Sequence, residues 1–564
     1  MTTIWRLEPE PGRQTLGRFL EDVAERHGER PAIRSRQREL SFQGLRAEAR
    51  SLARGLVGAG VGKGTRVGLL MANGPEWAVA AFAASMVGAV LVPVNTFAKG
   101  EERDHILRHG DVSLLLMQRE LLTRDFADEL VSGHPELGTS EAGGRLRSEA
   151  LPQLRRVFVL GGAGPGALEP WEALRALGRD VPEGLLDALA AEVTPSDDAM
   201  IIYTSGTTSL PKGVLHLQRA PVLQSWRFAE LMGLTGEDRL LTAFPFFWTA
   251  GICMSLGASL AAGAVLLTDE AFDAGAALER IERDGATVVH AWPHQEKEMA
   301  EHPEAESRDL SSARKIEIGS PLAGLVGLEK DEYSTYASYG LSETFTICSA
   351  LPASTPAEIR RPTHGRPLPG MLLRIVDPQT GEPVAAGASG EIAVKGRTLM
   401  RGYYKVDPEC YLDENGFFRT QDAGWIDEAG YLHWTGRLSN LIKSGGANVS
   451  PVEIEARALE FPGLHVSAAV AVPHPTLGEA VVLCAVPAEG QAIDPDALRA
   501  FLKERLSAYK VPRAVLLFEE SEVRYTGNQK LQVEPLREKA RLRLAQDRTE
   551  IAGHRYDRMP GDGG

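Results

Sequence analysis

The stretch that decides the fold reads Tyr203-Thr204-Ser205-Gly206-Thr207-Thr208-Ser209-Leu210-Pro211-Lys212-Gly213. It gathers small hydroxyl residues and two glycines around one lysine, and it follows an apolar run at 199–202 that predicts a strand. Gly206 lets backbone N–H groups approach an anion closely, the hydroxyls add donors, and Lys212 adds a positive charge. The stretch therefore predicts a triphosphate cradle. It differs from the common P-loop, in which Ser or Thr follows the lysine and a helix begins at once.

Size and composition limit the class of protein. A chain of 564 residues exceeds what one hydrophobic core usually supports, so several subdomains are expected. The net charge of −15 argues against non-specific nucleic-acid binding, which needs a basic surface. The four cysteines are far apart and form no Cys-x-x-Cys pair, which excludes the common zinc and redox motifs and fits a reducing cytoplasm. The N-terminus shows no signal peptide, because no apolar core follows a basic head.

Strands and helices alternate along the first part of the chain. The run 67–71 predicts a buried strand, a helix follows, and 89–93 predicts the next strand, which indicates an α/β fold with a mostly parallel sheet. The apolar runs 77–94 and 250–267 approach membrane-spanning length, but glycines interrupt both. Each is predicted as a buried helix that turns into a buried strand, so no membrane span is expected.

A glycine pattern at 162–167 imitates a dinucleotide-binding fingerprint. It reads Gly162-x-Gly164-x-x-Ala167 after a predicted strand. Such a fingerprint must open a helix, whereas Pro165 and Gly166 favour a continuing loop. We interpret the segment as a linker, and a nicotinamide-dependent oxidoreductase is the alternative that rests on this feature alone.

The pattern changes towards the C-terminus. Alternating strands separated by glycine-rich turns predict a β-rich subdomain at about 355–438, within a large domain of residues 1–438. Residues 439–545 predict a small α+β domain, and the polar stretch 546–564 predicts a flexible tail.

The stretch 203–213 resembles the phosphate-binding loop of the adenylate-forming superfamily, which contains acyl-CoA synthetases, peptide-synthetase adenylation domains and beetle luciferases. Ser209 stands where that family usually has glycine. At least four further motifs follow in the family's order, and the resemblance spans roughly residues 15–537. It implies a large N-terminal domain with parallel α/β subdomains and a β-rich subdomain, followed by a small, mobile α+β C-terminal domain.

The resemblance implies a nucleotide site in the large domain. Tyr339-Gly340-Leu341-Ser342-Glu343 resembles the motif in which the tyrosine stacks on adenine, the hydroxyl meets the α-phosphate and the glutamate binds Mg²⁺. Asp422 matches the carboxylate that accepts the ribose hydroxyls, although Gln421 replaces the family's glycine before it. The residues implied in nucleotide binding are Thr204, Ser205, Gly206, Thr207, Thr208, Lys212, Gly319, Ser320, Pro321, Tyr339, Gly340, Ser342, Asp422 and Arg437.

The same resemblance implies a second set of residues around the small domain. Ser439 occupies the hinge position, where the family mostly has Asp or Lys. Lys443, Gly445 and Gly446 match positions used in the thioester-forming state, where the glycine pair lines a narrow pantetheine tunnel. Lys530 matches the catalytic lysine, which bridges the attacking carboxylate and the α-phosphate, but Gln529 replaces the glycine before it.

The segment 244–251 resembles one that often reads Pro-x-Phe-His-x-x-Gly, with Trp248 in place of the histidine. An indole there adds apolar wall to an acyl pocket, or it fills core space instead. No fixed cation is evident that would hold a second carboxylate, so the expected acid is bulky and apolar: aryl, alicyclic or fatty. The expected pocket residues are Phe247, Trp248, Gly251, Ser338 and Phe345.

The ordered motifs predict an ATP-dependent acyl-CoA synthetase that uses ATP, Mg²⁺ and CoA. It would form an acyl-adenylate from a carboxylic acid and then the CoA thioester, releasing pyrophosphate and AMP. The expected location is cytoplasmic, nucleic acid is not an expected partner, and a homodimer is allowed. Two alternatives stay open: a standalone enzyme that loads a carrier protein, and a catalytically weak nucleotide-binding relative prompted by Ser209, Ser439 and Gln529.

Overall fold

A computed structural model of the chain describes residues 8–139, 143, 145–162, 164–204, 211–330, 333, 337–438, 441–444, 447–506, 510–525 and 531–556. The chain divides into two compact units. Unit 1 comprises Met1–Leu373 and Val394–Phe418, and unit 2 comprises Arg374–Ala393 and Arg419–Gly564. The division passes through three strands of one sheet, and the boundary predicted after residue 438 stays a prediction.

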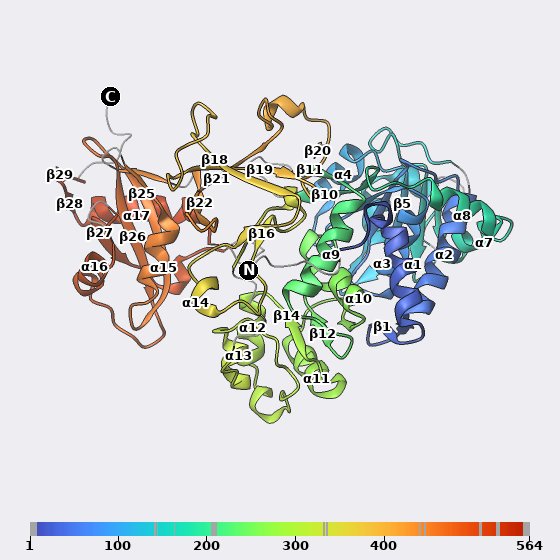
Figure 1. Cartoon of the computed structure of the whole chain (residues 1–564), viewed down its shortest axis with the longest axis horizontal. Coiled ribbons are helices and arrows are strands. Elements are labelled where there is room, and N and C mark those ends of the chain that lie inside the picture. The colour runs from blue at the N-terminus through green and yellow to red at the C-terminus, as the bar shows by residue number, and fades with distance from the viewer. Residues whose placement is uncertain are drawn as a thin grey trace. The chain divides into compact units, whose positions relative to one another are not determined.

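Unit 1 contains an eight-stranded, mostly parallel sheet (Figure 1). The strands β3, β4, β5, β8, β9 and β10 pair in parallel, whereas β11 runs antiparallel to both β10 and β20. The predicted α/β class is confirmed. In sheet order the strands are β20 (Gly402–Tyr403), β11 (Lys212–Leu217), β10 (Asp198–Thr204), β4 (Val90–Pro93), β3 (Arg66–Leu70), β5 (Leu114–Gln118), β8 (Arg156–Leu160) and β9 (Leu168–Pro170).

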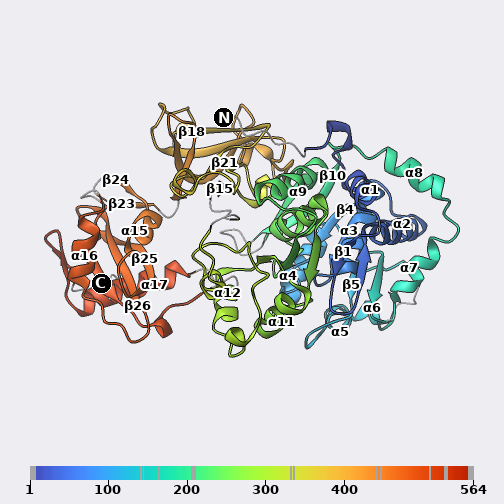
Figure 2. The same ribbon diagram turned by 60° about the horizontal axis from the view of Figure 1, so that its bottom comes forward.

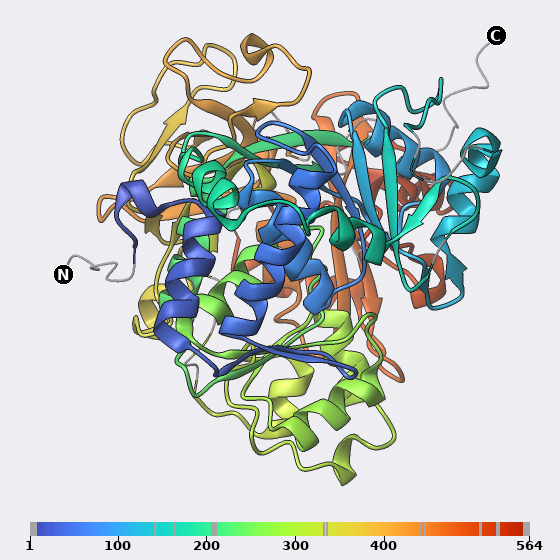
Figure 3. The ribbon, with the colours of Figure 1, turned by 90° about the vertical axis from the view of Figure 1, so that its right-hand side faces the viewer.

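Three early helices, α1 (Leu16–His27), α2 (Phe42–Gly58) and α3 (Pro75–Met86), pack against one another, and the dark-blue ribbons of Figure 3 lie side by side. Every residue of α3 except Glu76 is buried, and β4 follows it. The apolar run 77–94 is thus a buried helix that turns into a buried strand, as predicted. No helix among the described residues is long and apolar enough to cross a membrane. The other helices beside this sheet are α4 (Gly100–His109), α5 (Phe126–Gly133), α6 (Pro135–Thr139), α7 (Trp171–Leu177), α8 (Glu183–Ala191) and α9 (Arg219–Leu231).

A second, five-stranded sheet joins the beginning of the chain to its middle. Its order is β14 (Val288–His290), β12 (Arg239–Thr242), β13 (Val265–Thr268), β1 (Pro31–Arg34) and β2 (Glu39–Ser41). The second apolar run forms the π-helix η2 (Gly251–Gly257), the helix α10 (Ala258–Ala262) and β13, again as predicted. Helices α11 (Ala274–Asp284), α12 (Pro293–Ala300) and α13 (Pro321–Val326) follow.

The glycine segment at 162–167 opens no helix in its described part, residues 162 and 164–167. It links β8 directly to β9, and α7 begins only at Trp171. The dinucleotide reading has no structural support, because the N–H groups of a helix N-terminus are missing where the pyrophosphate would bind. The linker interpretation is therefore the one that the structure bears out.

Unit 2 contains most of a four-stranded sheet and the whole of a further one. The four-stranded sheet consists of β18 (Met371–Val376), β19 (Gly390–Gly396), β21 (Phe418–Ile426) and β22 (Leu432–Arg437), and the first residues of β18 and β21 and the last of β19 belong to unit 1. A further sheet contains β23 (Ile442–Ser444), β24 (Ala447–Val449), β25 (Leu464–His474), β26 (Gly478–Pro487) and β27 (Ala514–Leu517). Successive residues of β25 enter opposite cores, so α15 (Pro451–Ala458) and α16 (Pro495–Lys503) cover one face and α17 (Val533–Gln546) covers the other (Figure 2).

The polar stretch expected as a flexible tail begins with ordered structure. After α17, the strands β28 (Glu550–Ile551) and β29 (His554–Arg555) form a hairpin. Ile551 and Tyr556 are buried, and the Tyr556 hydroxyl donates a hydrogen bond to the Pro473 carbonyl at 3.0 Å. The expectation for 546–556 is corrected, because two apolar side chains suffice to bind this segment to the core of unit 2.

Candidate active site

The hairpin of β10 and β11 brings the two ends of the predicted phosphate cradle together. Thr204 pairs with Lys212 across the antiparallel strands. The cradle residues Ser205, Gly206, Thr207 and Thr208 lie outside the described residues. Lys212 is exposed, and its Nζ lies 5.4 Å from the centroid of the Tyr403 ring, within cation–π range.

Glu343 lies in a short turn between the strands β15 (Ser338–Tyr339) and β16 (Ser349–Ala350). Tyr403 donates a hydrogen bond from its hydroxyl to Oε1 of Glu343, and the Met400 N–H donates to the Glu343 carbonyl at 2.6 Å. Tyr403 thus contacts both predicted phosphate-site charges: Lys212 with its ring face and Glu343 with its hydroxyl. Sequence reasoning missed Tyr403, because no motif marks it and its contacts form only when β20 pairs with β11.

The turn after Glu343 is strained. Phe345 and Thr346 have φ values of 52° and 91°, a region that non-glycine residues enter at a cost of about 1–3 kcal/mol each. Phe345 is fully buried, and its ring meets the His216 ring edge-on at 4.8 Å between centroids. Burial lowers the pKa of His216 to about 3, so this imidazole is neutral at pH 7. The role of Phe345 as a residue of the acyl pocket stays a prediction.

Glycine is required at position 340 by the same turn. A Cβ there would lie 2.2 Å from the Thr346 carbonyl oxygen and 2.3 Å from Cα of Ile347. Tyr339 is buried, and Ser338 pairs with Ala350. Ser342 begins the short helical turn η4 (Ser342–Thr344) and is half-buried. The whole motif therefore folds as one tight loop.

An aromatic cluster surrounds the segment predicted to form the acyl pocket. Phe247 and Trp248 meet at 4.9 Å, Trp248 and Trp292 at 6.4 Å, and Phe244 and Trp292 at 4.5 Å between ring centroids. Trp248 is half-buried, so part of the indole remains accessible. Gly251 packs closely, since a Cβ there would lie 2.1 Å from the Pro245 carbonyl oxygen. Trp292 was missed in the sequence, because it joins the cluster from a separate strand–helix connection.

The segment Gly319-Ser320-Pro321 begins α13. Ser320 caps the helix by accepting a hydrogen bond from the Ala323 N–H at 3.2 Å, and Pro321 is its first residue. Gly319 has φ +83° and borders a cavity of about 560 Å³. The other lining residues are Ile318, Arg361, Pro362, Thr363 and His364.

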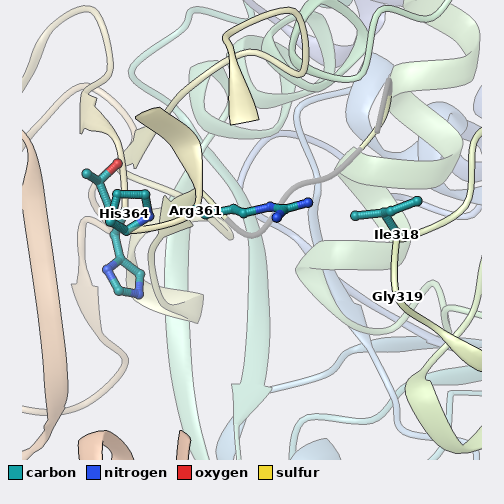
Figure 4. Close-up of a pocket in the computed structure, with 6 residues that line it drawn as sticks. Ile318, Gly319, Arg361 and His364 are labelled. Atoms are coloured by element: carbon teal, nitrogen blue, oxygen red, sulfur yellow. The ribbon is translucent and has the colours of Figure 1, made fainter. Parts of the chain in front are cut away.

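Figure 4 shows the Arg361 side chain extended across this cavity towards Ile318. Arg361 is a cation at this cavity that no motif in the sequence marks. The side chain is exposed, so its charge is well solvated.

Glu296 on α12 lies close to the same segment. Burial raises its pKa to about 7, the Ser320 hydroxyl opposes that shift by hydrogen bonding, and Glu317 contributes to it by charge repulsion. Glu296 is therefore near half-ionised at neutral pH. This residue was also missed, because nothing in its sequence surroundings predicts burial of a carboxyl group.

Asp422 and Arg437 meet within unit 2. They are register partners on β21 and β22, and Nε of Arg437 lies 3.0 Å from Oδ1 of Asp422. Gln421 has φ +61°, in the left-handed region that the family's glycine enters without strain. The buried carboxylate of Glu391 holds it by accepting hydrogen bonds from the Gln421 N–H at 2.9 Å and from Nε2 at 3.2 Å.

The remaining predicted residues of unit 2 lie mostly beyond the described part. Lys443 is exposed on β23, and its backbone N–H donates to Oε2 of Glu479 at 2.7 Å. The residues Ser439, Gly445, Gly446 and Lys530 lie outside the described residues, so their roles stay predictions.

The described residues contain no cluster of three or more His, Cys, Asp or Glu side chains that could hold a metal ion. One carboxylate, Glu343, stands beside the predicted phosphate site. Mg²⁺ in nucleotide enzymes commonly binds through one or two carboxylates, substrate phosphates and waters. The arrangement at Glu343 fits such an ion.

Comparison with known proteins agrees with this geometry. The family described as AMP-binding enzyme matches residues 20–404, and the AMP-binding enzyme C-terminal domain matches residues 453–530. The putative acyl-CoA synthetase YngI of Bacillus subtilis (strain 168) is 30% identical over 534 residues, which cover 93% of this chain and 97% of that protein. The 3-[(3aS,4S,7aS)-7a-methyl-1,5-dioxo-octahydro-1H-inden-4-yl]propanoyl:CoA ligase of Rhodococcus jostii (strain RHA1) is 32% identical over 509 residues, with coverages of 88% and 93%.

A solved structure shows the same fold. The anthranilate CoA ligase AuaEII in complex with anthranoyl-AMP has a TM-score of 0.76 at 24% identity, over 95% of this chain and 99% of that one. The large and small domains that the sequence predicts are those of adenylate-forming enzymes. The chain belongs to the AMP-binding enzyme family and is an AMP-forming acid:CoA ligase, which confirms the family and the reaction class that the motifs predict.

Proposed function

We propose that this ligase activates a bulky apolar carboxylic acid and that Lys212, Tyr403 and Glu343 form the centre of its adenylation site. The observation that carries the proposal is the contact of Tyr403 with both charged residues beside the cradle hairpin. A cation and a carboxylate on one tyrosine suit a nucleotide phosphate and its counterion. Lys212 would oppose the phosphate charge directly, and Glu343 would do so through the Mg²⁺ that it would hold.

In the first step the carboxylate of the acid attacks the α-phosphorus of ATP, and the bond to pyrophosphate breaks. Lys212 and the cradle hydroxyls bind the phosphates, and Lys530 bridges the attacking carboxylate and the α-phosphate. Glu343 would hold Mg²⁺, which supplies neutralisation of the phosphate charge when bound. Tyr403 keeps the Glu343 carboxylate in one orientation by its hydrogen bond.

In this proposal, residues of two parts of the chain bind the nucleoside: 319–339, and the strands that carry Asp422 and Arg437. Tyr339 stacks on adenine, beside Gly319, Ser320 and Pro321. Asp422 accepts the ribose hydroxyls and Arg437 contacts ribose and phosphate. The ion pair between Asp422 and Arg437 supports this proposal, because it holds an acceptor and a donor together on adjacent strands.

In the second step the CoA sulfur forms a bond to the acyl carbon, and the bond from that carbon to the phosphate oxygen breaks, so AMP leaves. Lys443, Gly445 and Gly446 serve this step, after a rotation about Ser439. The exposure of Lys443 supports the proposal, since the side chain is available to a substrate.

The proposed acid is aryl, alicyclic or fatty. The half-buried Trp248 and its neighbours Phe247 and Trp292 offer a wall of aromatic carbon. The Rhodococcus relative is named for a bicyclic propanoate, which is an acid of this class. Gly251 and Ser338 complete the proposed pocket with small residues.

Two parts of the proposal concern the surroundings of the enzyme. The reducing cytoplasm is the proposed location, supported by the free thiols of Cys253, Cys348, Cys410 and Cys484. The homodimer stays an expectation. The family and the CoA-ligase relatives argue against the two alternatives raised by the sequence, a standalone enzyme that loads a carrier protein and a catalytically weak relative.

The test is pyrophosphate release over a panel of acetate, benzoate, a medium-chain fatty acid and a polycyclic acid, followed by mass spectrometry of the products with CoA or a holo-carrier protein. The proposal expects the highest kcat/KM for a bulky acid and a CoA thioester as product. A preference for acetate or an amino acid would overturn the substrate class. Acylation of the carrier protein in place of CoA would contradict CoA as the acceptor. ATP binding without formation of acyl-AMP would indicate a catalytically weak nucleotide-binding protein.

A further inference from the structure

One buried side-chain amide binds three carbonyl groups of the strained turn after Glu343. Gln224 lies in α9, is fully buried, and donates from Nε2 to the carbonyl oxygens of Thr344 at 3.1 Å, Phe345 at 3.0 Å and Ile347 at 2.6 Å. The three carbonyls span the two residues with positive φ, Phe345 and Thr346.

The contact is directional. Three carbonyl oxygens converge on one side-chain atom, and only an N–H donor is tolerated there, because an oxygen would face them without a proton. Oε1 of Gln224 has no hydrogen-bond partner among the described residues. The orientation of the amide is therefore determined by the turn that it binds.

Two further contacts hold the buried side of the turn. The Phe345 ring packs against His216 of β11, and Sγ of Cys253 in η2 lies 3.1 Å from Oγ1 of Thr346. Neither contact donates to the turn's carbonyls. Of these three contacts, only Gln224 binds the carbonyls and so fixes their direction. It therefore supports Glu343 from the buried side of the backbone, while the Met400 N–H binds the Glu343 carbonyl from the other segment.

We infer that Gln224 is a positioning residue for adenylation, which holds the left-handed turn so that the Glu343 carboxylate faces the MgATP phosphates. The inference rests on the proposed role of Glu343. Residues that orient a metal ligand typically change metal affinity by roughly 10- to 100-fold when they are replaced. Gln224 acts in this way from behind the loop and touches no substrate.

The experiment compares Gln224→Met with Gln218→Met. Gln218 is the matched control, because it is equally buried and accepts a backbone hydrogen bond from the Leu16 N–H at 3.1 Å, away from the turn. Two quantities are measured in the full-length enzyme: the Mg²⁺ concentration for half-maximal pyrophosphate release, and Mn²⁺ binding by electron paramagnetic resonance in the presence of a non-hydrolysable ATP analogue. We expect Gln224→Met to weaken both by about 10-fold or more, and Gln218→Met to change neither.

A rescue variant separates positioning from stability. Thr346→Gly removes the side chain from the position with φ 91°, so the turn forms there without strain. In the Gln224→Met background it is expected to restore part of the metal affinity. Thioester formation from supplied acyl-AMP should stay at the wild-type rate in all three variants.

The outcomes divide cleanly. Equal loss of thermal stability in the two glutamine variants, with wild-type metal affinity in both, would show that Gln224 is only structural and overturn the inference. Should Gln224→Met fail to fold, Gln224→Asn is measured in its place, and wild-type metal affinity in that variant would equally contradict positioning. If Glu343→Gln leaves the Mg²⁺ requirement unchanged, the proposed metal role of Glu343 is wrong, whatever Gln224 does.

Discussion

The hydroxyl of Tyr403 donates a hydrogen bond to Oε1 of Glu343, although the two residues lie 60 positions apart in the chain. The bond forms because β20 pairs with β11, which places Tyr403 beside the strand that begins at Lys212. One tyrosine therefore links the cation and the carboxylate that flank the predicted phosphate cradle.

Replacing Tyr403 by Phe keeps the ring face for Lys212 and removes the donor to Glu343. Hydrogen bonds to charged groups contribute about 1.5–3 kcal/mol, so we expect acyl-AMP formation to slow by roughly 10- to 100-fold. Pyrophosphate release measures this step, and thioester formation from supplied acyl-AMP should be unaffected. Tyr404→Phe is the control, because the Tyr404 hydroxyl donates to Asp111 instead; equal effects in both variants would argue against a specific role.

The two predicted lysines should separate the half-reactions. Lys530→Ala is expected to reduce adenylation by roughly 10²–10³-fold and largely spare thioester formation, since it removes a charge that stabilises the first transition state. Lys443→Ala is expected to do the reverse. Adenylation is followed by pyrophosphate release from ATP and the acid, and thioester formation is followed from supplied acyl-AMP and CoA. Equal losses in both steps for both variants would contradict a division of labour about Ser439.

Trp248→Ala tests the acyl pocket. Removing the half-buried indole enlarges the space beside Phe247 and Trp292, so the preference should shift towards larger acids by the ~1–3 kcal/mol that apolar contacts discriminate. The measurement is kcat/KM for benzoate and for a polycyclic acid, with KM for ATP as the internal control. An unchanged preference would place Trp248 in the core.

The stability of the enzyme should depend on pH through Glu296. Its pKa is raised from 4.5 to about 7 in the folded state, so between these values the folded state binds more protons than the unfolded state. By linkage, the contribution of Glu296 to the free energy of unfolding falls as pH rises through that interval and is lost above it. Glu296→Gln is therefore expected to raise Tm relative to wild type at pH 8 and to raise it less at pH 5. Glu298→Gln, an exposed change on the same helix, should show no such difference.

Gly340→Ala should be severely destabilising. The added Cβ would meet the backbone of Thr346 and Ile347 at 2.2 and 2.3 Å, and neither strand of this tight loop can move without breaking the turn that carries Glu343. Thermal unfolding and ATP binding are the measurements. Gly62→Ala is the matched control, because its Cβ would meet no atom within 4 Å. A Gly340→Ala enzyme with wild-type Tm would show that the loop relaxes freely.

The local pattern of the sequence determined the family, the reaction class and the alternation of strands and helices. The cradle at 203–213 and the motif at 339–343 are continuous stretches of sequence whose residue types suit phosphate and metal binding, so they can be recognised without coordinates. The same holds for the runs 77–94 and 250–267, whose glycines and small residues indicated buried helix and strand rather than a membrane span.

The tertiary structure alone decided which distant side chains meet. Tyr403 reaches Glu343, Gln224 binds the strained turn, Trp292 joins Trp248, and Ile551 and Tyr556 secure a segment whose composition predicted a flexible tail. The strain at Gln421 likewise shows only in the backbone angle, where the buried Glu391 holds a non-glycine residue in a left-handed conformation. These relations depend on strand pairing and packing between segments far apart in sequence, and local propensity carries no information about such contacts.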